Sequence, residues 1–239
     1  MELVDKLSNR QYIDGEWVES SNKNTRDIIN PYNQETIFTV AEGTKEDVER
    51  AILAARRSFE DGEWSLETSE VRGKKVRAVA DKIKENREEL AKLETLDTGK
   101  TLEESYADMD DIHNVFMYFA GLADKDGGEI INSPIPNAES KVVKEPVGVV
   151  TQITPWNYPL LQASWKIAPA LATGCSLVMK PSEITPLTTI RVFELMEEVG
   201  FPKGTINLVL GAGSEVGDVM SGHEEVDLVS FTGGIETGK

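Results

Sequence analysis

Short apolar runs separated by turn residues open the chain. Gln11-Tyr12-Ile13 and Glu16-Trp17-Val18-Glu19 flank Asp14-Gly15, a pair of residue types that suits a two-residue hairpin turn. Ile28-Ile29-Asn30-Pro31 and Thr36-Ile37-Phe38-Thr39-Val40 predict two further short strands. The N-terminal part is therefore expected to begin with strands.

Helical periodicity follows these strands. Thr44-Lys45-Glu46-Asp47 is typical of a capped helix start, and apolar residues continue at helical spacing from Val48 to Phe59. Similar apolar stripes run through residues 76–83, 90–96 and about 105–122. We interpret these stripes as core-facing helix surfaces rather than functional sites.

From about residue 146 the pattern changes to an alternation of strands and helices. Strands are predicted at residues 147–154, 176–179, 205–210 and 226–231, with helices at 164–173, 186–199 and 214–220 between them. Gly174 and Gly200 are well placed to end the first two helices, and Thr185 to cap the second. Continuous apolar strands separated by helices predict a parallel sheet covered on both faces. The expected class is α/β, with N-terminal strands and helices over 1–145 and a Rossmann-like sheet over 146–239.

Composition and charge limit the classes of partner and the compartment expected for the chain. The net charge is −17 and the pI about 4.6, so nucleic acid and anionic membrane surfaces are poor partners. Cys175 is the only cysteine, which excludes an intramolecular disulfide. The sequence shows neither a signal-peptide pattern nor an apolar run long enough to span a bilayer, so a cytoplasmic location is expected.

The densest cluster of unusual residues is Thr154-Pro155-Trp156-Asn157-Tyr158-Pro159, followed by Lys166. It closes the first strand of the alternating region, where ligands bind in α/β sheets. The G-x-G-x-x-G fingerprint of ordinary Rossmann dehydrogenases is absent there. Gly211-Ala212-Gly213 follows the third strand and would either admit a nucleotide or only form a tight turn.

A second candidate closes the next strand at Lys180-Pro181-Ser182-Glu183. A carboxylate there can accept hydrogen bonds from a ribose diol and would repel a 2′-phosphate, which favours NAD over NADP. Taken alone, Lys180 and Glu183 are interpreted as a solvated surface pair.

Together these segments resemble, in order and spacing, the NAD(P)-dependent aldehyde dehydrogenases. The resemblance rests on 156–159, Lys166, 180–183, the Gly213 loop and Phe231-Thr232-Gly233-Gly234, with N-terminal landmarks at 14–17, 29–31 and 96–100. Within the family, residues 156–171 look most like the betaine aldehyde dehydrogenases. The implied fold is a truncated aldehyde dehydrogenase fold, in which 1–145 also contributes to an oligomer arm and the catalytic domain is absent.

The resemblance implies roles for residues around the predicted cleft. NAD, or NADP, would be bound by Ile153, Thr154, Trp156, Lys180, Glu183, Gly213 and Gly234. Asn157 would be the amide donor of an oxyanion hole. Lys166 matches a lysine with a charge-relay role, although a structural salt bridge would account for it equally well.

It also implies a substrate pocket and a cation site. Tyr158 and Trp165 would line the aldehyde tunnel, where a trimethylammonium group gains about 0.5–2 kcal/mol from each aromatic face. Asp108 and Asp111 share a helix face, which would point into the tunnel or simply be solvated. Ile28 and Asp97 match positions that bind a monovalent cation such as K⁺.

The implied activity is NAD-dependent oxidation of an aldehyde, betaine aldehyde to glycine betaine, in a homo-oligomeric full-length parent. In the family's pattern, the nucleophilic cysteine and the glutamate base lie beyond residue 239, and Cys175 is expected to be a buried, inert thiol. The 239 residues alone are therefore expected to be inactive. The alternative is a non-catalytic NAD-binding module or a fragment that needs a partner chain.

Overall fold

The computed structural model describes residues 3–125 and 127–238. Its centre is a six-stranded sheet with the order β10-β7-β8-β9-β1-β2. These strands are β1 (Gln11–Ile13), β2 (Glu16–Val18), β7 (Val149–Ile153), β8 (Ser176–Lys180), β9 (Ile206–Leu208) and β10 (Leu228–Phe231). β10, β7, β8 and β9 are parallel, which confirms the Rossmann-like sheet.

The N-terminal hairpin extends this sheet. Asp14 and Gly15 have φ angles of 56° and 80°, the left-handed pair that a tight hairpin turn requires. β1 pairs antiparallel with β2 and, through Tyr12 and Leu208, with β9. The hairpin was predicted from the sequence. Its pairing with β9 was not predicted, because no local sequence pattern indicates a contact between segments so far apart in the chain.

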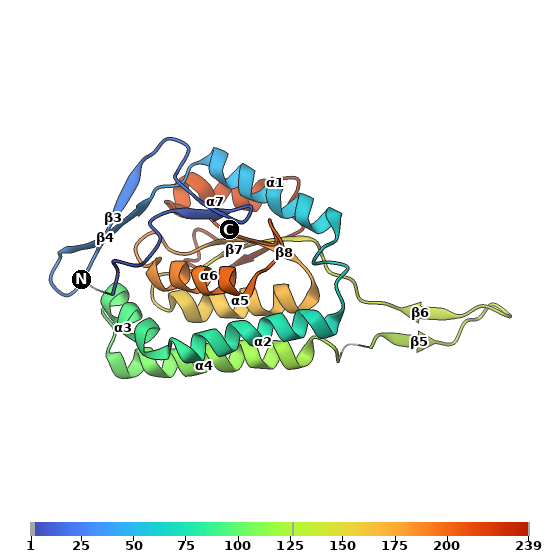
Figure 1. Cartoon of the computed structure of the whole chain (residues 1–239). Coiled ribbons are helices and arrows are strands. Elements are labelled where there is room, and N and C mark those ends of the chain that lie inside the picture. The colour runs from blue at the N-terminus through green and yellow to red at the C-terminus, as the bar shows by residue number, and fades with distance from the viewer. Residues whose placement is uncertain (1–2, 126, 239) are drawn as a thin grey trace.

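Helices cover both faces of the sheet, as Figure 1 shows. They are α1 (Lys45–Asp61), α2 (Ser69–Glu85), α3 (Arg87–Thr98), α4 (Leu102–Leu122), α5 (Pro159–Thr173), α6 (Leu187–Val199) and α7 (Gly213–Gly222). α1 and α7 pack on one face, where Val48, Val178 and Val216 share a smaller core. α5 and α6 cover the other face, with α2 and α4 outside them in a larger core that contains Val76, Ile112 and Leu177.

Two predicted helix starts were wrong. α5 begins at Pro159 rather than Ser164, because a proline at the first helical position needs no N–H partner. The strand-to-helix turn is therefore only five residues long. Thr185 does not cap α6. Pro186 takes the N-cap position, and the Thr185 hydroxyl donates to the carbonyl of Trp156 at 3.2 Å.

Two small hairpins lie outside the central sheet. β3 (Thr25–Ile29) pairs with β4 (Thr36–Ala41), and β5 (Glu129–Ile131) pairs with β6 (Ser140–Val142). The β5–β6 hairpin projects away from the body in Figure 1, and the sequence pattern did not predict it. Within the described ranges, no helix has the length and apolarity needed to cross a bilayer.

Candidate functional site: a cleft at the carboxyl ends of the parallel strands

A cleft of about 520 Å³ opens where β7, β8 and β10 end. Its lining includes every residue that the resemblance assigned to the cofactor: Ile153, Thr154, Trp156, Lys180, Glu183, Gly213 and Gly234. Asn157, Gln162, Ser182, Phe231, Thr232 and Gly233 complete most of the wall. These residues, up to 81 positions apart, therefore meet because parallel strands end at the same edge of the sheet.

The turn after β7 is fixed by its neighbours and presents its tip to solvent. The Thr154 backbone N–H donates to the carbonyl of Lys180 at 3.2 Å, which ties the ends of the two strands together. Trp156 is 58% exposed at the cleft, and the Asn157 side chain is exposed beside it. The Asn157 amide makes no hydrogen bond to any other residue that the structure describes, so it is available to a ligand.

Lys180 and Glu183 form a partly buried pair, and not a solvated one. Lys180 is only 2% exposed, and its ammonium donates to the carbonyl of Pro181 at 2.9 Å and to Glu183 at 3.4 Å. Burial lowers the pKa of Lys180. Burial pushes the pKa of Glu183 upward, but its own backbone N–H and the nearby Lys180 outweigh that effect and leave the pKa below its usual value. A fixed carboxylate of this kind suits a ribose diol.

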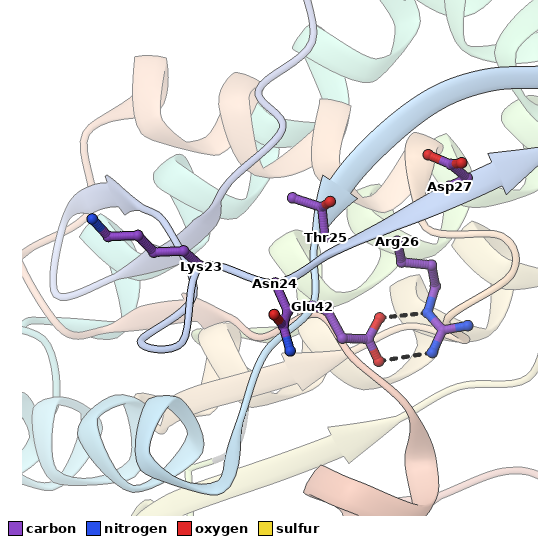
Figure 2. Close-up of a pocket in the computed structure, with 6 residues that line it drawn as sticks. All are labelled: Lys23, Asn24, Thr25, Arg26, Asp27 and Glu42. Carbon is purple, nitrogen blue, oxygen red and sulfur yellow. Dashed lines mark hydrogen bonds and ion pairs between the residues drawn. The ribbon is translucent and has the colours of Figure 1, made fainter.

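The glycine loop at the other side of the cleft is held by the β3–β4 hairpin. Glu42, directly after β4, accepts two hydrogen bonds from Arg26, at 2.5 and 2.7 Å (Figure 2). The same carboxylate accepts the backbone N–H of Ala212 at 3.0 Å. Ala212 is the N-cap of α7 and precedes Gly213 in the cleft wall. The sequence did not indicate Arg26 and Glu42, because Ala212, which Glu42 holds, lies 170 residues away from Glu42.

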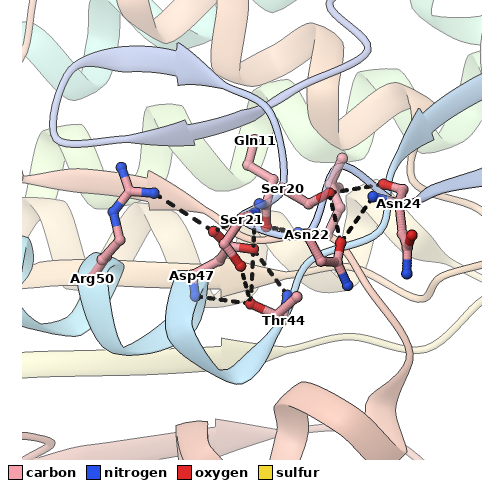
Figure 3. Close-up of polar contacts among 9 residues, drawn as sticks. Gln11, Ser20, Ser21, Asn22, Asn24, Thr44, Asp47 and Arg50 are labelled. Atoms are coloured by element: carbon pink, nitrogen blue, oxygen red, sulfur yellow. Dashed lines mark hydrogen bonds and ion pairs between the residues drawn. The ribbon is translucent and has the colours of Figure 1, made fainter.

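Further contacts lock the start of this loop. Gly43 donates to the Leu210 carbonyl at 2.9 Å, and the Gln11 amide oxygen accepts from the Leu210 N–H at 3.2 Å. A Cβ on Gly43 would lie 2.1 Å from that carbonyl, so only glycine allows the approach. Figure 3 shows Gln11 beside the capping box of Thr44 and Asp47 at the start of α1. Gly213 itself faces open space, since a Cβ there would meet nothing within 4 Å.

Lys166 lies beneath the cleft, on α5. Its ammonium donates to the hydroxyls of Ser230 at 3.1 Å and Thr232 at 2.9 Å, and Thr232 lines the cleft. No carboxylate among the described residues forms an ion pair with it, so the structure does not show the salt bridge that was the alternative for this residue. Burial lowers the pKa of the Lys166 ammonium.

Of the four candidate substrate residues, Asp111 and Trp165 share one cavity, while Asp108 and Tyr158 are not part of its lining. Asp111 and Trp165 line a smaller cavity of about 340 Å³ together with Asn114, Val115, Tyr118, Phe119 and Leu161. Asp108 is buried instead and pairs with Lys100 at 2.6 Å. Tyr158 is the N-cap of α5, directly after Asn157, and is 38% exposed.

The candidate cation ligands are both buried. One oxygen of Asp97 accepts the Leu187 N–H at 2.9 Å, and the other has no hydrogen-bond partner among the residues that the structure describes. Burial raises the pKa of Asp97 well above its usual value. Ile28, on β3, is 1% exposed. A buried carboxylate oxygen without a donor is a suitable ligand for a hard cation.

Cys175 and the histidines take no part in these sites. Cys175, directly before β8, is 2% exposed, as expected for an inert thiol. His113 contacts the Ala80 carbonyl at 3.0 Å, and His223 caps the Glu225 N–H at 3.1 Å. No group of three metal-ligating side chains occurs within residues 3–125 and 127–238.

Comparisons with protein families and with known proteins all identify aldehyde dehydrogenases as similar to this chain. The aldehyde dehydrogenase family model matches residues 17–239. Betaine aldehyde dehydrogenase of Bacillus subtilis is 66% identical over 233 residues, which cover 98% of this chain and 48% of that protein. Aminoaldehyde dehydrogenase 1, peroxisomal, of Pisum sativum is 46% identical over 240 residues, covering 97% of this chain and 48% of that protein.

Solved structures agree with the fold. A crystal structure of betaine aldehyde dehydrogenase from Staphylococcus aureus in complex with NAD⁺ matches with a TM-score of 0.99 and 90% identity, and the match covers 99% of this chain and 47% of the other. The chain thus spans about half the length of the relatives it matches. On the family match and these similarities, the chain belongs to the aldehyde dehydrogenase family.

Proposed function

We propose that this chain forms the NAD-binding portion of a betaine aldehyde dehydrogenase, which oxidises betaine aldehyde to glycine betaine in the cytoplasm. The observation that carries the proposal is the single cleft that brings seven candidate cofactor residues together beside the exposed side chain of Asn157. The relatives named betaine aldehyde dehydrogenase support the substrate.

Two parts of the cleft wall, at Glu183 and at Gly213, are suited to binding NAD. Glu183 would accept the hydroxyls of the adenosine ribose, and Lys180 holds that carboxylate in place. A 2′-phosphate would be repelled by Glu183, so we propose NAD over NADP. Gly213 would admit the cofactor because no side chain projects from it. When bound, NAD accepts the hydride that leaves the aldehyde carbon.

The chain's own residues would stabilise and relay charge. The Asn157 amide would donate to the oxygen of the tetrahedral adduct as negative charge develops on it. Lys166 would relay a proton toward the cleft through the Thr232 hydroxyl, helped by the lowered pKa of its buried amine. Because Cys175 is buried, we propose that the attacking thiolate comes from residues outside these 239.

We also propose a K⁺ ion at Asp97, with the backbone carbonyl of Ile28 as a further ligand. Its expected role is structural, since it would neutralise a buried carboxylate beside the start of α6. Potassium chloride should then raise the thermal midpoint of the wild-type protein above its value in choline chloride. The same salts should give equal midpoints for Asp97→Asn, and an unchanged wild-type midpoint would exclude the ion.

The β5–β6 hairpin is proposed as an oligomer arm. It projects from the body (Figure 1) and exposes Ile130, Ile135 and Val143. Apolar residues of this size on a projecting hairpin favour burial against another copy of the chain. Residues 1–145 would therefore contribute both to the cofactor domain and to assembly.

The test of the function is a comparison of two aldehydes in the complete gene product. Betaine aldehyde and 3,3-dimethylbutanal have the same shape, and only the first carries a positive charge. We expect NAD reduction with a kcat/KM at least about fivefold higher for the cationic aldehyde, from two aromatic contacts. NAD binding without turnover of any aldehyde would instead favour the non-catalytic module.

A further inference from the structure

Lys100 occupies an unusual place for a lysine. It lies between α3 and α4, yet its side chain is only 9% exposed. Its ammonium lies 2.6 Å from a carboxylate oxygen of Asp108 and 3.5 Å from one of Glu94. It also lies 4.2 Å from the centroid of the Tyr158 ring, over the ring face. A buried cation therefore contacts the aromatic residue next to Asn157.

This contact affects ligand binding because a cation can bind on either face of an aromatic ring. With Lys100 on one face of Tyr158, a cationic ligand could bind only on the other face. A cation–π contact contributes about two- to thirtyfold in affinity. Tyr158 is 38% exposed, so part of the ring remains open to a ligand. A substrate cation on that open side would sit roughly 8 Å from the Lys100 ammonium. At an effective dielectric of about 20, two positive charges at that separation repel by an amount equivalent to about thirtyfold in affinity. Without a counter-charge, Lys100 would cancel the benefit of the ring.

Asp108 supplies the nearer counter-charge, because Glu94 lies farther from the ammonium, at 3.5 Å, and burial raises the pKa of Glu94. Its carboxylate is about as buried as the Lys100 ammonium and contacts it directly at 2.6 Å. The same burial separates Asp108 from the cavity lined by Asp111 and Trp165. Asp108 is thus placed to act on Lys100 and not on a ligand in that cavity. One helical turn separates the two carboxylates, but their surroundings are different.

We propose that the buried Lys100–Asp108 pair is a specificity-determining unit that lets the Tyr158 ring accept a cationic aldehyde. Lys100 positions the ring from one side, and Asp108 neutralises Lys100. Asp108 therefore favours the substrate's positive charge without touching it. This inference rests on the proposed function, because it requires that a cationic aldehyde is oxidised at this site.

The experiment is a double-mutant cycle in the complete gene product, read as the ratio of KM for 3,3-dimethylbutanal to KM for betaine aldehyde. Asp108→Asn should lower this ratio about tenfold or more, since it leaves Lys100 with only the more distant Glu94 as a counter-charge, and should change kcat for the neutral aldehyde much less. Lys100→Met alone should keep the ratio or raise it. The double variant Lys100→Met/Asp108→Asn should return the ratio to within about threefold of wild type.

The cycle distinguishes an action of Asp108 through Lys100 from direct contact with the substrate and from a structural role. If Asp108 contacted the substrate directly, the KM ratio of the double variant would be as low as that of Asp108→Asn. That result would overturn the proposal. An Asp108→Asn variant that impaired both aldehydes equally would show a merely structural role and would also overturn it. If Asp108→Asn fails to fold, the double variant still decides between the two roles. A wild-type protein with no preference for betaine aldehyde would instead refute the proposed function.

Discussion

At the scale of single residues, Asn157 is placed by its neighbours rather than by contacts of its own. Thr154 pairs with the end of β8, Thr185 anchors the Trp156 carbonyl, and Pro159 starts α5. The side chain between these anchors is left exposed at the cleft, and its amide is unpaired within residues 3–125 and 127–238. This is how an oxyanion donor must be presented, because its hydrogen bond is to be formed only with the reacting oxygen.

Replacing Asn157 therefore tests a single hydrogen bond. Asn157→Ala in the complete gene product should lower kcat for betaine aldehyde about 10²–10³-fold and leave NAD affinity nearly unchanged. The measurement is steady-state kinetics with an NAD titration of each variant. A kcat within a few-fold of wild type would remove Asn157 from the oxyanion role. Gln162→Ala, at another position of the cleft wall, is the matched control.

At the scale of elements, the β3–β4 hairpin sets the position of the glycine loop through Glu42. Glu42→Ala should weaken NAD binding about tenfold, because Ala212 and Arg26 both lose their acceptor. Glu42→Gln keeps an acceptor for Ala212 and should weaken binding less. NAD quenching of tryptophan fluorescence reports the affinity, with Glu19→Ala, in an exposed ion pair, as the control. Equal affinities in all four proteins would rule out the anchoring role.

Helix α3 carries a buried acid with a consequence for stability. Burial raises the pKa of Glu94 from 4.5 to about 7, and Thr188 donates to it at 2.6 Å. Between these pH values the unfolded chain releases a proton that the folded chain keeps. The free energy of unfolding should thus fall by about 3 kcal/mol as pH rises through this window, with no further loss from Glu94 above it.

Glu94→Gln should remove this slope while keeping the acceptor for Thr188. Urea unfolding at pH 4.5 and pH 7.5 measures it, and Glu88→Gln on the exposed side of α3 controls for general charge effects. A variant with the wild-type slope would show that Glu94 ionises normally in the folded protein.

Local signals explain which elements the sequence predicts. The Asp14-Gly15 turn, the capping box of Thr44 and the strand–helix alternation after residue 146 depend on neighbouring residues, and all appear in the structure. The β5–β6 hairpin has short, largely exposed strands with no alternating pattern, so it escaped prediction. The Glu42–Ala212 and Lys100–Asp108–Tyr158 contacts depend on tertiary packing. Spacing alone therefore could not distinguish buried Asp108 from Asp111.

At the scale of the whole molecule, the two cores join the N-terminal helices to the parallel sheet, while the β5–β6 hairpin stands apart (Figure 1). Ile130→Glu combined with Ile135→Glu should shift the complete gene product to a smaller species in light scattering, because a charge cannot be buried unpaired in an interface. Lys141→Ala, on the same hairpin, should leave the mass unchanged. An unaltered mass in the double variant would show that the hairpin is not the arm.

The central claim is that the cleft at the ends of β7, β8 and β10 binds NAD, and a calorimetric titration of the purified protein tests it most directly. We expect one NAD per chain, NADP at least about tenfold weaker, and a large loss of affinity in Gly213→Leu, whose side chain would enter the cleft. Gly217→Leu, one turn further along α7 and outside the cleft wall, should bind as wild type does. The absence of saturable NAD binding at millimolar concentration, or equal binding by Gly213→Leu, would contradict the account.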